Sequence, residues 1–214
     1  TIKNLKATTP LIKEVTSVKD LTIDATCSFT STTSPVLASV AEKTNGVITN
    51  VTNNAPVTVT MSAIDAGYVM GGLVAYAYGN IDRCANNGAV SISATFANTG
   101  AAGGIVGYTE AQVDNTNNSG NVTVAFDEVG VKVAVVNVTA APSIGGVVGL
   151  AQGNGTFSMT NCTNSGTINY SLKSALVSTG MTRCGIAGIV GSPNGKVEKC
   201  TNTGEIIVNL PLAA

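Results

Sequence analysis

The 214-residue chain contains no histidine and no tryptophan. Without histidine it lacks the commonest general base and the commonest metal ligand. Only 11% of the residues are charged and the formal net charge is −1. So few Lys and Arg residues cannot assemble the basic face that nucleic-acid binding needs, and no nucleic-acid partner is expected. Aromatic residues make up 4%, so any platform that stacks on a ligand must use the few Tyr and Phe residues.

Other common signals are also missing. No apolar run approaches the ~20 residues that cross a bilayer, so no transmembrane segment is expected in this fragment. The opening "TIKNLKATTP" has no Met and no charged-then-apolar leader, which is typical of a mature or excised piece whose signal or lipoprotein anchor lies outside it. The five cysteines are odd in number and lack C-x-x-C spacing, so neither a zinc site nor a disulfide framework is indicated. We expect no metal and no cofactor.

The residues that are abundant favour strands. Apolar residues, mostly Val, Ile and Ala, make up 44% of the chain, beside 24 glycines and many Thr, Ser and Asn residues. This mixture is typical of short strands joined by tight turns. No segment shows a sustained helical pattern of apolar residues.

Two short patterns alternate along the chain, which indicates a repeat protein. The first is a glycine-led apolar run: "GGLVAY" from Gly71, "GGIVGY" from Gly103, "GGVVGL" from Gly145 and "AGIVGS" from Ala187. The second follows each run: "DRCANNGAVSIS", "DNTNNSGNVTVA", "TNCTNSGTINYS" and "EKCTNTGEIIVN". The steps between successive runs are unequal, which indicates a common unit with loops of variable length.

Aligning the second pattern on its turn glycine produces columns of equivalent residues. The glycine column holds Gly88, Gly120, Gly166 and Gly204, preceded by the degenerate Ala55. Two places earlier stand Asn53, Asn86, Asn118, Asn164 and Asn202. Four places earlier stand Cys84, Thr116, Cys162 and Cys200, with Val51 and Leu21 in the two earlier copies.

Each unit contains about three short strands and is too small to bury its own apolar face, but stacked units can bury it. The sequence therefore predicts an all-β protein, a right-handed parallel β-solenoid (β-helix) with roughly three short strands per coil and five to six coils. We expect a single domain over residues 1–214, with regular coils at about 47–210 and a less regular N-terminal coil at 1–46.

The asparagine column predicts a structural ladder, in which each side-chain amide bonds to the next coil at a bend. The cysteine column predicts small core thiols, because Thr, Val and Leu occupy the same position. Cys162 and Cys200 fall on adjacent coils, where a Cα separation of ~4.8 Å also permits a disulfide. That alternative stays open at this point.

The strings "GGIVGY" and "VDNTNNSGNVTV" resemble the GLUG-type repeat, "GGLVGy…I.NCyNtG.V", of bacterial secreted and surface proteins, and "VKDLTIDATCSFT" is similar to cell-surface proteins of Bacteroidetes. The resemblance covers about residues 15–210. It implies a non-catalytic binding or adhesion-type module that is secreted or displayed on a bacterial cell surface. The partner that it implies is a cell-surface glycan or protein.

A binding edge and two rival functions follow from the non-repeating parts. The insertions Asp127 to Ser143 and Ser171 to Cys184 both precede a glycine-led run, so their shared corner is a candidate ligand-binding edge carrying Lys132, Tyr170, Lys173 and Arg183. A polysaccharide lyase or glycoside hydrolase, or the accessory domain of one, is the main rival, but the acids offer only one column of Asp82, Asp114 and Glu198. Ice binding is disfavoured because the coils carry no regular threonine grid.

Overall fold

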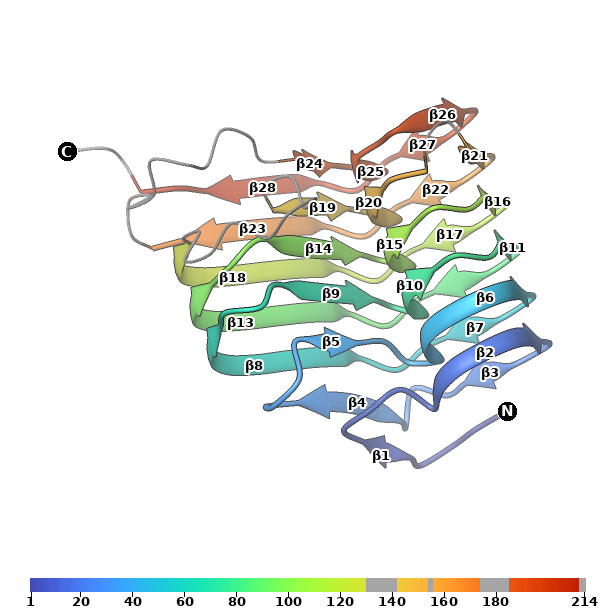
Figure 1. Cartoon of the computed structure of the whole chain (residues 1–214), viewed down its shortest axis with the longest axis horizontal. Coiled ribbons are helices and arrows are strands. Elements are labelled where there is room, and N and C mark those ends of the chain that lie inside the picture. Colours follow the sequence, from blue (N-terminus) through green and yellow to red (C-terminus); the bar gives the residue numbers. More distant parts are fainter. Residues whose placement is uncertain (130–141, 154–155, 174–184, 212–214) are drawn as a thin grey trace.

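The computed structural model describes residues 1–129, 142–153, 156–173 and 185–211. Within these ranges all the regular structure consists of short strands, and every strand pair is parallel. Figure 1 shows the chain winding through successive coils, with equivalent strands stacked one above another. The predicted parallel β-solenoid is confirmed, and its handedness stays a prediction.

The alternating stretches that follow the turn glycines form one seven-stranded sheet, whose strands stack in chain order. The strands are β1 (Lys6–Ala7), β4 (Ser28–Ser31), β8 (Val57–Ile64), β13 (Val90–Ala97), β18 (Val122–Val129), β23 (Ile168–Leu172) and β28 (Ile206–Asn209).

A ten-stranded sheet contains the second half of each glycine-led run and the short strand that follows it. The long strand β6 pairs with members of both sets and so joins them. The strands are β2 (Ile12–Lys19), β6 (Ala41–Thr49), β10 (Val74–Ala77), β11 (Ile81–Asp82), β15 (Val106–Thr109), β16 (Val113–Asp114), β20 (Val148–Ala151), β21 (Phe157–Thr160), β25 (Val190–Ser192) and β26 (Gly195–Glu198).

Two smaller sheets complete the cross-section of the solenoid. The six-stranded sheet carries the asparagine column on β7 (Thr52–Asn53), β12 (Ala85–Asn86), β17 (Asn117–Asn118), β22 (Thr163–Asn164) and β27 (Thr201–Asn202), while β3 (Thr22–Ile23) places Ile23 in that column. The five-stranded sheet holds the residues that lead into each glycine-led run and its first residue, in β9 (Tyr68–Gly71), β14 (Gly100–Gly103), β19 (Ser143–Gly145) and β24 (Gly185–Ala187), with β5 (Val36–Leu37) as the equivalent strand before them.

A regular coil therefore has five short strands, such as β9 to β13, rather than the three expected. The glycine-led run is not one strand, because it bends between Gly103, where β14 ends, and Val106, where β15 begins. A Cβ on Gly104 at this bend would lie 2.2 Å from the carbonyl oxygen of Gly146 and 2.3 Å from Cγ of Asn118. Only glycine fits there, so the double glycine makes a corner against the asparagine column.

The core runs continuously up the inside of the stack. In the seven-stranded sheet the in-register residues Ile92, Val124 and Tyr170 are all buried. Ser91 and Thr123, each one place earlier on its strand, are only half-buried. This alternation is the one-face-in pattern of a strand, repeated coil after coil. Because every coil adds the same apolar positions, each one buries the core of its neighbours.

The asparagine ladder is confirmed. The Nδ2 atoms of Asn53, Asn86, Asn118 and Asn164 each donate to Oδ1 of the asparagine one coil later, at 2.7 to 2.9 Å. The same Nδ2 atoms also donate to the main-chain carbonyl two residues later, at 2.7 to 2.9 Å. These side chains are buried, so the amides satisfy main-chain groups that the bend leaves unpaired.

The column of Cys and Thr residues also bonds to the main chain. Thr116 Oγ1 donates to the carbonyl of Asp114 at 2.7 Å, and Cys162 Sγ donates to the carbonyl of Thr160 at 3.4 Å. Cys27, Cys84, Cys162 and Cys200 are free thiols. Burial raises the pKa of Cys84 to about 11 and that of Cys162 to about 12. Both thiols therefore stay protonated and act as small buried donors, as the core interpretation expects.

The residue before each member of that column lies in the left-handed region of backbone conformation. The φ angles are 50° at Arg83, 51° at Asn115, 55° at Asn161 and 51° at Lys199. Asparagine tolerates this conformation better than most residues because its short side chain bonds locally. The corner is therefore set by the backbone, and two coils place a long basic residue where asparagine fits better.

Candidate functional site: a tyrosine-lined groove

A groove of about 610 Å³ lies where the five-stranded sheet meets the ten-stranded sheet. Its lining residues come from four successive coils and are Pro35, Val36, Ala66, Gly67, Tyr68, Val69, Tyr76, Tyr78, Thr99, Gly100, Ala101, Tyr108, Leu150 and Gln152. The chain has only five tyrosines, and four of them line this groove. Most of the tyrosines are therefore gathered at one place.

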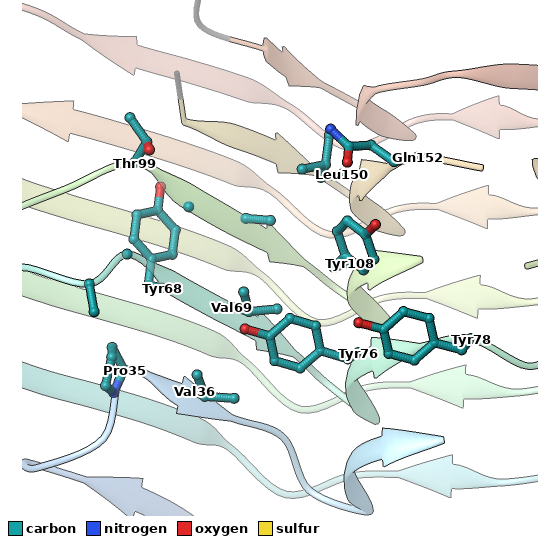
Figure 2. A pocket seen from close by; sticks show the side chains of 14 residues that line it. Pro35, Val36, Tyr68, Val69, Tyr76, Tyr78, Thr99, Tyr108, Leu150 and Gln152 are labelled. Atoms are coloured by element: carbon teal, nitrogen blue, oxygen red, sulfur yellow. The ribbon is translucent and has the colours of Figure 1, made fainter. Parts of the chain in front are cut away.

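Three tyrosine rings form one wall. Tyr76 on β10 and Tyr108 on β15 occupy the same column, and their ring centroids lie 6.0 Å apart. Tyr78, just after β10, lies 6.0 Å from Tyr108 and is 42% exposed. Figure 2 shows Tyr76 pointing across the groove towards Val69, with Tyr78 and Tyr108 beside it. Tyr78 is exposed and Tyr76 and Tyr108 are half-buried, so part of the ring surface stays open to a ligand.

The opposite wall is small and apolar. Val36, Val69 and Ala101 are in register on β5, β9 and β14. Tyr68 is fully buried, and its ring packs 5.3 Å from that of Phe126. A Cβ on Gly100 would lie 2.6 Å from the Tyr68 ring, so glycine there makes room for the tyrosine beneath the groove.

A second, more polar hollow of about 330 Å³ adjoins the groove and shares Tyr108 and Gln152 with it. Glu110, Gly153 and Thr156 complete its lining. The Tyr108 hydroxyl donates to Oε1 of Glu110 at 2.6 Å. The groove thus passes from an apolar floor to a group of hydrogen-bonding side chains, the combination typical of small-molecule and sugar sites.

The phenols of Tyr76 and Tyr108 hold their protons at physiological pH. Burial raises the pKa of Tyr108, and the hydrogen bond to the Glu110 carboxylate raises it further. Burial also raises the pKa of Tyr76, with smaller contributions from Tyr78 and Glu42. A ligand therefore meets neutral rings.

The lysine beside the Tyr78 ring already has a carboxylate partner. Lys43 Nζ lies 5.6 Å from the centroid of the Tyr78 ring and 3.1 Å from Oε1 of Glu14. Its charge is therefore already balanced by a carboxylate. The Glu14 pKa is lowered by this hydrogen bond and by the lysine charge.

The predicted binding edge is only partly described. Lys132 and Arg183 lie outside the described residues. Tyr170 is 2% exposed and packs in the core, so its side chain is not available to a ligand at the surface. Lys173 is exposed, and its Nζ lies 2.6 Å from Oδ1 of Asp127. Tyr170 is therefore corrected to a core residue, because the inward face of β23 places it in register with Val124.

The acidic column lies in register, as the alignment predicts, with Asp82, Asp114, Thr160 and Glu198 stacked in that order. Its two outer members pair with cations close to them in sequence: Arg83 Nε lies 2.9 Å from Oδ2 of Asp82, and Lys196 Nζ lies 2.9 Å from Oε1 of Glu198. Among the described residues, no group of three or more Cys, Asp or Glu side chains converges to hold a metal ion. Nor does that part of the chain contain a helix long and apolar enough to span a membrane.

Sequence reasoning missed the groove, although a signal for it was present. "GGLVAY" and "GGIVGY" both end in tyrosine, so the repeat places Tyr76 and Tyr108 in one column. "AYAY" adds Tyr78 on the same side of the strand. The alternation of tyrosine with alanine at the end of a buried run indicates these ring positions in the sequence. The sequence does not show that the two sheets meet in a concave corner there.

The architecture defines the chain as a parallel β-solenoid repeat protein with an aromatic groove along one corner. A family model described as the GLUG motif matches residues 140–169, the segment that runs from β19 into β23. The predicted GLUG-type repeat is thereby confirmed. No curated protein and no solved structure matches the chain.

Proposed function

We propose that this repeat module binds a glycan in the tyrosine-lined groove and has no catalytic activity of its own. The observation that carries the proposal is the gathering of Tyr76, Tyr78 and Tyr108 beside a small hydrogen-bonding hollow. The C–H bonds on the face of a pyranose ring suit an aromatic face, which is electron-rich, while the sugar hydroxyls need polar partners at the rim.

The absence of catalysis rests on the acids near the groove. Glycoside hydrolysis ordinarily uses two carboxyl groups that flank the scissile bond. Among the described residues that line the groove and its adjoining hollow, Glu110 is the only carboxylate. One carboxylate that already accepts a hydrogen bond from Tyr108 supports binding better than the rival lyase or hydrolase function.

We also propose that the module works outside the cytoplasm, in a secreted or surface-displayed protein. This step rests on the GLUG motif and its resemblance to bacterial surface proteins, not on the groove. Protease treatment of intact source cells should release peptides of this chain while cytoplasmic marker proteins stay intact. If the peptides appear only after the cells are lysed, the chain is not at the surface.

A glycan array probed with the purified chain tests the binding function. We expect retention on at least one class of oligosaccharide, and a loss of about tenfold in affinity, or about 1.4 kcal/mol, for Tyr78→Ala. Tyr78→Phe keeps the ring and should bind nearly as well as the parent. Because Tyr78 is well exposed, circular dichroism should show both variants folded.

Lys173→Ala is the matched control, since this exposed residue belongs to the edge predicted from the sequence and lies away from the groove. If Lys173→Ala abolishes binding and Tyr78→Ala does not, the glycan site is at that edge instead. Mass spectrometry of the incubated oligosaccharides should show no shorter products, and their appearance would establish an enzyme.

A further inference from the structure

The walls of the groove repeat along the solenoid axis. On one wall Val36, Val69 and Ala101 follow each other in register on successive coils. On the other wall Tyr76, Tyr108 and Leu150 do the same. Neighbouring strands lie ~4.8 Å apart, so the groove offers a similar apolar surface at each step of that length. A surface with a regular step fits a ligand that is itself made of linked similar units.

One end of the groove is apolar and the other is polar. Its first coils contribute Pro35 and Val36, whereas its last coil contributes Leu150 and Gln152 beside the hollow with Glu110. A ligand that reaches from the tyrosines to Gln152 must therefore lie along the axis. A single sugar ring on Tyr78 would leave that end of the groove unused.

The lining also selects against charge. None of the described residues that line the groove is charged, and the adjoining hollow adds a carboxylate without a basic partner in its lining. The ammonium group of Lys43, 5.6 Å from the centroid of the Tyr78 ring, is paired with the carboxylate of Glu14. A uronic acid or a sulfated sugar would bring a negative charge against a lining whose described residues include no cation to receive it, which costs free energy. Neutral hydroxyl groups can instead donate to Glu110.

We propose that the ligand is a neutral, linear oligosaccharide that lies along the solenoid axis, with successive rings on successive coils. This inference rests on the proposed glycan binding and specifies its ligand class. Contacts then accumulate as the ligand lengthens, until it spans the coils that line the groove. Affinity should rise steeply with the number of linked rings and then level off.

Isothermal titration calorimetry tests the inference with defined probes. The neutral probes are oligosaccharides of one, two, four and six units derived from cellulose, xylan, mannan, starch and chitin. The acidic probes are oligomers of the same lengths from pectin and alginate. We expect at least one neutral series to gain about tenfold or more in affinity between one and four units, and the acidic series to bind at least about tenfold more weakly than that neutral series.

Gln152→Ala tests the orientation. This variant should weaken binding of the four-unit ligand while changing binding of the two-unit ligand less, because only the longer ligand reaches the fourth coil. Length-independent binding that still requires Tyr78, or a preference for the acidic series, overturns the axial neutral ligand and leaves glycan binding intact. Failure of every probe to bind overturns both proposals.

Discussion

At the scale of single residues, the packing within and between coils restricts which side chain fits at a position. Gly104 must lack a side chain because the amide of Asn118 and the main chain of Gly146 occupy that space. The double glycine and the asparagine of the repeat are therefore one packing unit, although a long stretch of sequence separates them in each coil. This is why the two patterns recur together.

Asn118→Ala should cost stability while its neighbour tolerates the same change. The substitution removes hydrogen bonds to the carbonyl of Gly120 and to Asn164, and leaves one N–H of the buried Asn86 amide without its acceptor. We expect the free energy of unfolding to fall by about 3 kcal/mol. Asn117→Ala, on an exposed side chain, should change it by no more than about 0.5 kcal/mol. Urea denaturation followed by circular dichroism measures both, and equal losses would contradict the ladder.

Gly120→Ala should also destabilise the protein, for a steric reason. A Cβ on Gly120 would lie 2.0 Å from the carbonyl oxygen of Gly88 in the coil before it. We expect a loss of about 3 kcal/mol, because two packed main chains would have to separate. The reverse change in the same column, Ala55→Gly, should cost only about 1 kcal/mol or less. Thermal unfolding of the two variants compares them, and a neutral Gly120→Ala would show that the coils can part.

At the scale of strands and corners, the left-handed residue before the cysteine column fixes where the chain turns. Arg83 holds φ at 50°, a conformation that a side chain with a Cβ adopts at a cost of about 1 kcal/mol or more. Its ion pair with Asp82 is exposed and returns little. A residue that suits a positive φ at this corner should therefore increase the stability of the protein.

Arg83→Gly should stabilise the protein by about 0.5 to 1 kcal/mol relative to Arg83→Ala. Both variants lose the ion pair with Asp82, but only the glycine variant loses the Cβ that opposes a positive φ. The difference between their denaturation midpoints isolates the backbone term. Should the alanine variant prove equally stable, the corner carries no strain.

The repeat alignment predicted which residues stack on one another better than it predicted the number of strands per coil. Each member of the cysteine column, from Leu21 to Cys200, lies above its predicted partner, as the main-chain bonds from Thr52 to Leu21 and from Thr201 to Cys162 show. Those positions recur in sequence, so alignment can find them. The number of strands per coil was wrong because two bends were missed. The bend after Gly103 depends on the asparagine of the same coil, which only the three-dimensional packing brings to it. The other bend lies at the left-handed residue Asn115, between β16 and β17.

The groove could be predicted only in part, because the sequence repeat shows which residues share a column but not how the sheets pack. Tyr76 and Tyr108 share a column, which the repeat indicates. Val36 and Val69 belong to a different sheet, and their approach to the tyrosines depends on the angle between the two sheets. Function was sought in the insertions, because loops commonly carry it, whereas the candidate groove lies on the repeat itself.

At the scale of the whole molecule, stability should vary from coil to coil. β13 and β18 have a strand on both sides, whereas β28 pairs only with β23 among the described strands. The inward residues Ile206 and Val208 of β28 are 43% and 45% exposed, although Ile168 below Ile206 is fully buried. A coil with one neighbour gains about half of the contacts between coils.

Amide hydrogen exchange should therefore be slowest in β13 and β18 and fastest in β28. In a stack whose coils contact only their neighbours, the last coil opens without the others. Exchange measured by mass spectrometry on peptides from Val90–Ala97 and Ile206–Asn209 compares the two. Equal protection would mean that the whole stack unfolds as one unit.

The ladder also gives the solenoid an electrical direction. Every amide from Asn53 to Asn164 points its N–H towards the C-terminal coil, so the four dipoles align head to tail and reinforce one another. The two ends of the row differ: at Asn53 the oxygen accepts from the main chain of Ala55, while at Asn202 the amide donates to Gly204 and keeps a second hydrogen in line with the row. The row therefore has a polarity: it offers a donor at Asn202, whereas its acceptor at Asn53 is already bonded to the main chain.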